Sequence, residues 1–267
     1  MINLYDLQGN PLNMDGYKGL KLHVPSPSYD GDPIRIDGRG GEMILEKTLQ
    51  PRQLVADFYM KAKDYSDSLL LRDEIYRQIN EAEFFVSESR LPHKRWKVHF
   101  SDAYDMERLN HSMQTFSVPL TAMRGLAESE GTTLDPLTFT AEKWQVGQGL
   151  TLEEPKYSHN TTTFRIFNAG DVTIDPRDMP LEIIYRGRSN GLEIKNNTTG
   201  DVWKYNGTTS DVENIFIKDV RSLKNGNSIF KDTNKKLITL APGWNDFTLS
   251  GTLGVFLISF EHRFYYY

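Results

Sequence analysis

The sequence has no cysteine among its 267 residues, which excludes disulfide bonds and thiolate metal sites. It also lacks a long apolar run, since its longest candidate, Val255–Phe260, is far shorter than the roughly 18 residues of a membrane-spanning helix. The first ten residues lack the basic segment of a signal peptide. We therefore expect a protein that folds in a reducing cytoplasm and does not enter a membrane.

Basic residues are too few and too scattered for a nucleic-acid-binding surface. The chain has 31 Lys and Arg against 36 Asp and Glu, for a formal charge of −5. The densest acidic stretch, residues 101–154, holds 9 acidic and 3 basic residues. Stable binding of DNA requires clustered cations that neutralise phosphates. A DNA-binding protein is therefore disfavoured.

Motifs for catalysis or for metal binding are missing as well. None of the six histidines forms a His-x-x-x-His pair, and there is no Gly-x-Ser-x-Gly nucleophile motif. The glycine-rich segment Gly38–Gly41 lies between two strand candidates, 34–37 and 43–49, and not before a helix, so a tight turn is favoured over a phosphate loop. We predict no catalytic residue, no metal site and no cofactor, and hence no enzyme.

The first part of the chain has the alternating pattern of half-buried strands. Apolar residues recur at every second position in three segments, which are 54–60, 96–100 and 116–120. Pro119 lacks an N–H group, which predicts a strand that lies at a sheet edge or ends there. One helix is expected over Asp67–Asn80, capped by Ser66, Asp67 or Ser68, with Leu71, Ile75 and Ile79 as its apolar stripe. This pattern predicts an α+β domain over residues 1–130, mainly antiparallel β with one helix.

The remainder is glycine-rich over residues 131–150, which we interpret as a connection, and almost wholly β over residues 151–267. Turn pairs such as Asn190-Gly191 and Asn225-Gly226 predict tight hairpins between short strands. About eight strands so spaced favour a two-sheet sandwich or jelly roll. The strand candidates are Thr163–Phe167, Leu181–Arg186, Leu192–Lys195, Val202–Tyr205, Ile215–Lys218, Lys236–Leu240, Asp246–Leu249 and Gly254–Tyr267.

Three aromatic residues of the second domain allow two interpretations. Trp203, Tyr205 and Trp244 could form a sugar-binding platform, because carbohydrate faces stack on aromatic rings. Against this, aromatic rings are the usual filling between two sheets. The first interpretation gives an alternative function, a carbohydrate-binding module that recognises cell-wall polysaccharide.

The order of several motifs is similar to that of a known family. The motifs are Ile36–Gly41, Arg52–Phe58, the helix, Phe84–Ser87, Arg95–Val98, Phe164–Asp171, Leu240–Phe247 and Phe260–Tyr265. In this order they resemble the distal tail proteins (Dit) of siphophages that infect Gram-positive bacteria. None of these motifs carries catalytic residues.

The resemblance implies a structural virion protein of the tail tip, made in the bacterial host cytoplasm. Six copies would form a ring, the baseplate hub, that joins the tail tube to the adsorption apparatus and leaves a channel for DNA ejection. The N-terminal domain would build the ring, and the C-terminal domain would be a galectin-like sandwich facing outwards.

The resemblance also implies partners for host attachment and assembly. These are further copies of the chain, the major tail protein of the tube, the tape-measure protein, a tail-associated lysin or fibre protein and, in some relatives, a receptor-binding protein. DNA would be met only in transit. Residues 151–267 show no long insertion of the kind that grips receptor-binding proteins in some relatives.

Overall fold

The structure is a computed structural model, which describes residues 1–31, 33–35, 37–38, 40–41, 43–44, 47–80, 83–138, 143–150 and 155–267. The chain divides into two compact units, Met1–Glu128 with Tyr267 and Ser129–Tyr266. The three-part division at residues 130 and 150 stays a prediction.

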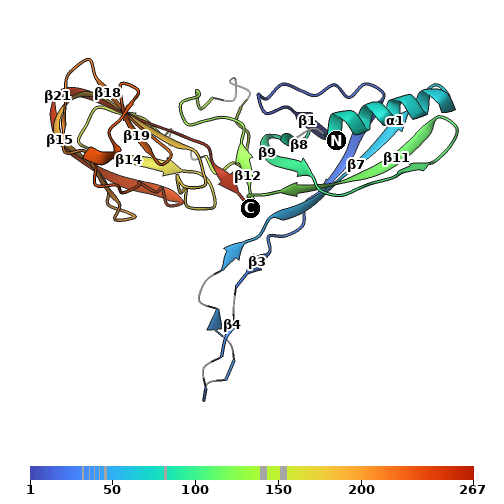
Figure 1. Cartoon of the computed structure of the whole chain (residues 1–267), viewed down its shortest axis with the longest axis horizontal. Coiled ribbons are helices and arrows are strands. Elements are labelled where there is room, and N and C mark those ends of the chain that lie inside the picture. Colours follow the sequence, from blue (N-terminus) through green and yellow to red (C-terminus); the bar gives the residue numbers. More distant parts are fainter. Residues whose placement is uncertain are drawn as a thin grey trace. The chain divides into compact units, whose positions relative to one another are not determined.

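The first unit is built on one antiparallel sheet (Figure 1) with the strand order β1-β8-β9-β11-β7-β2. The alternation in the sequence is confirmed, since Leu54, Ala56, Phe58 and Met60 of β7 are all buried. The strands are β1 (Ile2–Tyr5), β2 (Tyr17–His23), β7 (Arg52–Lys61), β8 (Glu83–Glu88), β9 (Leu91–Phe100), β10 (Met106–Arg108), β11 (Met113–Ala122) and β12 (Ala127–Ser129).

Pro119 does not lie on an edge strand, and that prediction is wrong. It lies in β11, which pairs with β7 along its whole length. On its other side β11 pairs with β10 up to Phe116 and with β9 from Leu120. Pro119 occupies the gap between these two partners, where no N–H group is needed, and its carbonyl accepts from Ser101 N at 3.1 Å.

The single α-helix of the described residues, α1 (Tyr65–Ile79), packs on this sheet. Its predicted stripe is confirmed, because Ile75 and Ile79 are buried in the core and Leu71 packs against it. The cap was predicted two residues too late. Asp64 is the N-cap, and its Oδ1 accepts from Asp67 N at 2.9 Å.

Between β2 and β7 the chain forms a hairpin arm of two short ladders (Figure 1). β3 (Tyr29–Asp30) pairs with β6 (Thr48–Leu49), and β4 (Pro33–Ile34) pairs with β5 (Met43–Ile44). Gly38, Gly40 and Gly41 of the predicted turn lie at the end of this arm, between β4 and β5. Ile36 and Arg39 of the family motif, with residues 45 and 46 of the second strand candidate, lie outside the described residues.

The second unit is all-β. Its sheet follows the order β13-β21-β15-β18-β19-β20, with β14 on β21 and with β16 and β17 on β15. The predicted strand over Lys236–Leu240 is wrong, since Leu240 forms only an isolated bridge with Ile174. The elements are β13 (Ser158–His159), β14 (Thr163–Asn168), β15 (Leu181–Asn196), β16 (Val202–Lys204), β17 (Thr208–Thr209), β18 (Asn214–Lys218), β19 (Arg221–Lys224), β20 (Asn227–Ser228), the 3-10 helix η2 (Phe230–Asp232), β21 (Gly243–His262) and β22 (Tyr265–Tyr266).

Two long strands replace four predicted short ones. Asn190-Gly191 is not a hairpin turn, because β15 continues through it and pairs with β21 on both sides, with register shifts after Gly187 and Ser189. Gly191 and Gly251 have φ values of 66° and 76°, and these positive values let both strands bend without ending. Asn225-Gly226, by contrast, forms the predicted turn between β19 and β20.

The bends fold the sheet into a sandwich. Phe247 and Phe260 both belong to β21, and 13 residues of straight strand would separate them by about 43 Å. Their ring centroids lie 4.9 Å apart, and Phe164 of β14 stacks on Phe247 at 5.5 Å. The two halves of β21 therefore face each other across one apolar core (Figure 1). The predicted fold class, an α+β domain followed by an all-β sandwich, is confirmed.

Candidate functional site

The outer face of α1 combines exposed apolar side chains with neutralised charge. Leu70 is 71% exposed and Tyr65 is 55% exposed, and the Arg108 guanidinium lies 5.3 Å from the Tyr65 ring centroid. Four of the five charged side chains of the helix form two ion pairs, Arg72–Asp73 at 2.8 Å and Arg77–Glu74 at 2.9 Å. Such a face can pack against another protein surface without a large charge to desolvate.

Hydrogen bonds hold α1 in one place on the sheet. The Tyr17 hydroxyl donates to Gln78 Oε1 at 2.8 Å, and Gln78 Nε2 donates to Asn13 O at 2.6 Å. Burial, helped by the charge of Glu74, raises the pKa of Tyr17 to about 12, so the hydroxyl keeps its proton. The helix therefore presents its outer face in a fixed orientation relative to the sheet.

An open groove of about 600 Å³ in the first unit is acidic. Asp57 lies in its floor, accepts from Ser117 Oγ at 2.7 Å and pairs with His23 Nε2 at 2.7 Å. Asp105 and Glu107 add two further carboxylates, and no Lys or Arg of the described residues lines the groove. It is lined by Leu20, Val55, Asp57, Phe58, Ala103, Tyr104, Asp105, Glu107, Thr115, Phe116, Ser117 and Pro119. The groove would repel a nucleic-acid backbone.

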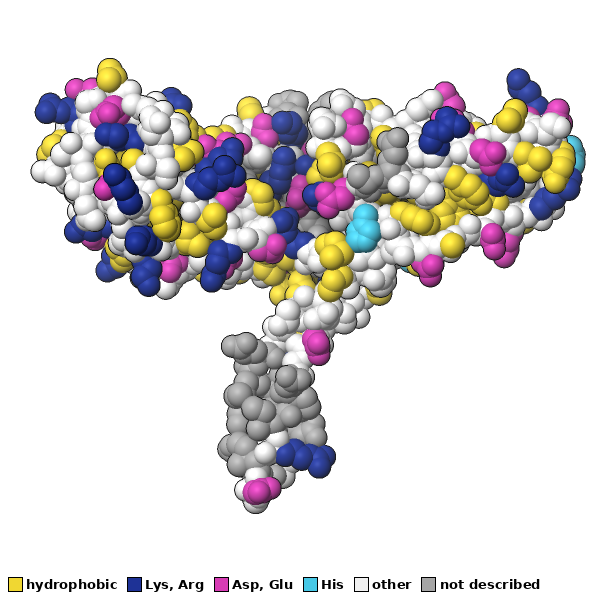
Figure 2. Space-filling view, viewed as in Figure 1, with side chains coloured by type: hydrophobic (Ala, Val, Ile, Leu, Met, Phe, Trp, Pro, Cys, Tyr) yellow, Lys and Arg dark blue, Asp and Glu magenta, His cyan; other side chains and the backbone are white. Residues whose placement is uncertain are grey.

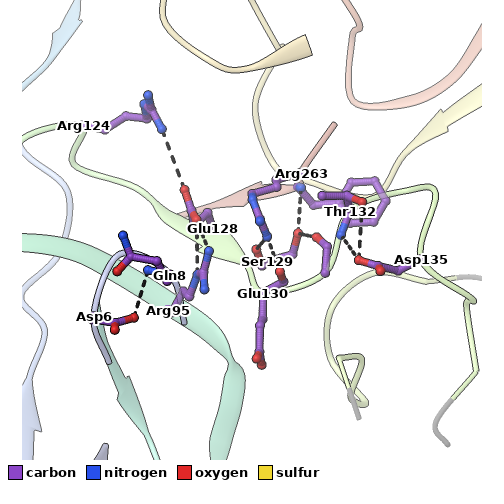
Figure 3. Close-up of polar contacts among 12 residues, drawn as sticks. Asp6, Gln8, Arg95, Arg124, Glu128, Ser129, Glu130, Thr132, Asp135 and Arg263 are labelled. Atoms are coloured by element: carbon purple, nitrogen blue, oxygen red, sulfur yellow. Dashed lines mark hydrogen bonds and ion pairs between the residues drawn. The ribbon is translucent and has the colours of Figure 1, made fainter. Parts of the chain in front are cut away.

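Glu128 anchors a buried ion cluster in the first unit (Figure 3). Its Oε1 accepts from Arg95 Nη2 at 2.9 Å and from Arg95 Nε at 3.2 Å, and its Oε2 lies 4.0 Å from Arg124 Nη1. Arg95 and Glu128 are both 8% exposed, and the Arg95 guanidinium also lies 3.7 Å from the Phe85 ring centroid. The cluster joins β8, β9 and the end of the first unit.

In the second unit, Arg263 fixes the first residues of the unit to its last ones (Figure 3). Its Nη1 donates to Ser129 O at 2.9 Å and to Glu130 O. Asp135 accepts from Thr132 N and from Lys143 Nζ, each at 2.8 Å. Burial alone would raise the pKa of Asp135, but these bonds outweigh it and the pKa lies below its ordinary value.

The three aromatic residues considered for sugar binding do not form an exposed platform. Trp203 is 1% exposed and donates from Nε1 to Ser222 Oγ at 3.1 Å, and Tyr205 is 5% exposed. Trp244 is half-buried, with the Arg165 guanidinium 4.5 Å from its ring centroid and Phe167 4.9 Å away. The rings of Trp203 and Tyr205 are buried in the core, and that of Trp244 packs against Arg165 and Phe167, so we do not propose a carbohydrate-binding module.

His262 is buried in the second unit among aromatic rings. It is 2% exposed, and the rings of Tyr157 and Phe264 lie 5.6 and 5.5 Å from it. Neither of its ring nitrogens has a hydrogen-bond partner among the described residues. Burial lowers the pKa of His262 to about 3, so the imidazole is neutral in the folded protein.

Acid is therefore expected to destabilise the second unit through His262. As the pH falls below about 6.5, His262 binds a proton in the unfolded chain, whereas in the folded protein it stays neutral down to about pH 3. The free energy of unfolding therefore decreases as the pH falls from about 6.5 to about 3. The contribution is about 2 kcal/mol between pH 7 and pH 5. Urea unfolding at both pH values should show a smaller decrease for His262→Phe than for the wild type. An equal decrease in both proteins would contradict this assignment.

Among the described residues, no group of three or more His, Asp or Glu side chains is placed to hold a metal ion. Within the same part of the chain, no helix is long and apolar enough to cross a membrane.

Comparisons with known proteins place these features in context. Residues 20–122 match the family of the phage tail protein RIFT-related domain. The solved structure of the Dit protein of phage SPP1, described as a hub of the adsorption apparatus in phages infecting Gram-positive bacteria, aligns with a TM-score of 0.72 at 14% identity and with 99% of each chain covered. No curated protein sequence matches the chain.

Two baseplate structures of phage p2 in the activated conformation align less well. The structure with strontium has a TM-score of 0.48 at 9% identity, and that with calcium has 0.45 at 10%. Each covers 98% of this chain and 97% of the other.

The resemblance drawn from the order of motifs is confirmed. Part of the chain matches a phage tail domain, and the agreement with SPP1 Dit extends through both units. The chain has the two-domain fold of a siphophage distal tail protein.

Proposed function

We propose that the chain is a structural hub protein of a phage tail tip, and that it acts by assembling with other tail proteins and not by catalysis. The observation that carries the proposal is the agreement with SPP1 Dit over 99% of both chains, together with the phage-tail domain at residues 20–122. The burial of Trp203 and Tyr205 supports it, because it leaves two of the three candidate aromatic rings inaccessible to a sugar.

The proposed assembly is a ring of six copies built by the first unit. β1 and β2 are the last strands on either side of its sheet, but they lie against each other, since a Cβ atom at Gly19 of β2 would lie 2.5 Å from Ile2 Cβ of β1, so we do not assign the contact between copies to these edges. The outer face of α1, with Leu70 and Tyr65 exposed, supplies an apolar surface for the neighbouring copy. Its orientation is fixed by Tyr17 and Gln78.

The ring would leave a channel through which DNA passes. Six copies would carry a formal charge of −30, six times the −5 of one chain. Negative charge in the bore would prevent lasting contacts with phosphate. The acidic groove of Asp57, Asp105 and Glu107 is a candidate for the surface that faces the DNA.

The proposed position is between the tail tube and the adsorption apparatus. The partners would be the major tail protein, the tape-measure protein and a tail-associated lysin or fibre protein, with a receptor-binding protein as a further candidate. Genes for a tape-measure protein upstream and for a lysin or fibre downstream would support this position.

Leu70→Asp is expected to prevent ring formation. A charge at the centre of an apolar contact must be desolvated, and a cost of about 3 kcal/mol or more would lower the assembled fraction at least about 100-fold. Native mass spectrometry of tail-end assemblies should show a species of about 184 kDa, six times the chain mass of 30.7 kDa, for the wild type only.

Met123→Asp is the matched control, because Met123 is 60% exposed but does not lie on α1. It should form the ring as the wild type does. A hexamer of unchanged yield from Leu70→Asp would contradict the role of α1, and a wild type that never forms hexamers on tails would contradict the ring.

A further inference from the structure

The outer surface of the second unit carries an apolar strip where β15 and β21 bend. Three side chains of β21 are exposed there: Leu253 at 47%, Val255 at 90% and Leu257 at 40%. Leu257 points away from the core, since Phe256 and Ile258 on either side of it are buried, and Leu253 shares its face with its cross-strand partner, the exposed Arg188. The strip is continuous, because all three lie within five residues of one strand.

The apolar strip extends across neighbouring strands. One row of cross-strand partners runs from Ile184 in β15 to Phe216 in β18 and on to Leu223 in β19. All three are half-buried and lie on the outer face, because Ile183, Tyr185 and Ile217 beside them point into the core. Ile184 of this row lies two residues before Arg186 on the same face of β15, and Arg186 pairs with Leu257.

The rim of this surface is basic. Arg186 is the direct cross-strand partner of Leu257 and Arg188 that of Leu253, and both arginines are exposed. Neither has an acidic partner among the residues that the structure describes. Beyond the row of Ile184 and Phe216, Lys218 of β18 and Glu182 of β15 form an ion pair at 3.5 Å. An apolar centre with a charged rim is the arrangement of protein interfaces (Figure 2 shows apolar and basic side chains interspersed on the visible face of this unit).

We propose that this surface, defined by Leu253, Val255, Leu257, Arg186 and Arg188, docks another protein of the tail tip through an acidic and apolar segment. The inference rests on the proposed function and names the partner's chemistry. Two unpaired arginines beside leucines are complementary to a partner segment in which carboxylates stand next to apolar side chains. An anionic wall polymer would pair with the arginines but leave the three apolar side chains in water. A protein partner would contact the arginines and cover the apolar side chains as well.

A photo-crosslinking amino acid at position 255 tests the proposal in intact phage particles. We expect a crosslink to one other tail protein, in a segment that contains Asp or Glu, identified by mass spectrometry of the crosslinked peptide. The matched control is position 230, since Phe230 is also an exposed apolar residue of this unit, at 43%, but lies in η2. It should give no such crosslink.

A charge reversal tests the arginines. The double variant Arg186→Glu and Arg188→Glu should lower the crosslink yield from position 255 at least about tenfold, because like charges then face each other. Lys195→Glu with Lys231→Glu, two exposed cations of the same unit away from the strip, should leave the yield unchanged.

Three outcomes would overturn the docking proposal: crosslinks only between copies of this chain, crosslinks only to glycan or wall polymer, and particles that contain the chain but give no crosslink at position 255. Absence of the chain from the particles would instead contradict the proposed function. Circular dichroism of the purified variants separates loss of docking from loss of fold.

Discussion

Glu128→Ala is expected to lower the free energy of unfolding by about 3–5 kcal/mol, the usual result of removing one partner of a buried ion pair. Arg95 would keep its charge at 8% exposure and lose the carboxylate that accepts from two of its nitrogens. The contact with the Phe85 ring remains, but it replaces only a part of that interaction. Urea unfolding followed by tryptophan fluorescence and by circular dichroism measures the loss.

Glu83→Ala provides the control for this substitution. Glu83 pairs with Lys97 at 2.6 Å in the same sheet, but the two side chains are 46% and 43% exposed. Solvent screens such a pair, so its loss should cost less than about 1 kcal/mol. Equal effects of the two substitutions would show that the Arg95–Glu128 cluster does not stabilise the first unit.

Gly251→Ala should destabilise the second unit by about 3–5 kcal/mol, since a backbone strain of about 1–2 kcal/mol is added to a steric clash. Gly251 has a φ of 76°, which disfavours any residue with a Cβ atom. A Cβ atom there would also lie 2.5 Å from Gly191 O and 2.7 Å from Asn190 O. Both are backbone atoms of the facing bend in β15, so neither can move without opening the sandwich.

Gly254→Ala separates the cost of backbone strain from the cost of the steric clash. Gly254 has the same φ of 76° and lies in the same strand, but a Cβ atom there would meet no atom within 4 Å. It should therefore lose only the strain of about 1–2 kcal/mol. Thermal unfolding of both variants tests the difference, and a Gly251→Ala protein as stable as Gly254→Ala would contradict the close approach of the two bends.

The repeating patterns of the sequence predicted the local elements well. Leu71, Ile75 and Ile79 recur at helical spacing, and alternation around Phe58 marks β7, because both patterns follow from the periodicity of buried positions. The helix cap was missed by two residues, since Asp64, Ser66 and Asp67 are all good capping residues and only the hydrogen bond to Asp67 N distinguishes Asp64.

The bent strands could not be predicted from local sequence. Asn190-Gly191 has the signature of a hairpin turn, and a positive φ at Gly191 serves a turn and a bulge equally well. The contact between Gly191 and the facing bend at Gly251 distinguishes the bulge from the turn, and it joins residues that are 60 positions apart in the sequence. Pro119 was misplaced for a similar reason, because its missing N–H falls between two partners of one strand.

The polar contacts of the candidate surfaces are also non-local. Arg95 and Glu128 are 33 residues apart, and the carboxylate of Asp57 meets a histidine 34 residues away and a serine 60 residues away. No spacing rule in the sequence connects them. The two interpretations of Trp203 likewise depended on which face of its strand points inward, and the register with β15 places it in the core.

The most direct test of the proposed function is a cryo-electron microscopy reconstruction of the tail end of phage particles that contain the chain. We predict six copies in a closed ring around an open channel, with the first units forming the ring and α1 buried between neighbours. Tails in which the chain is absent from this position, or in which its copies do not close around the channel, would contradict the central claim.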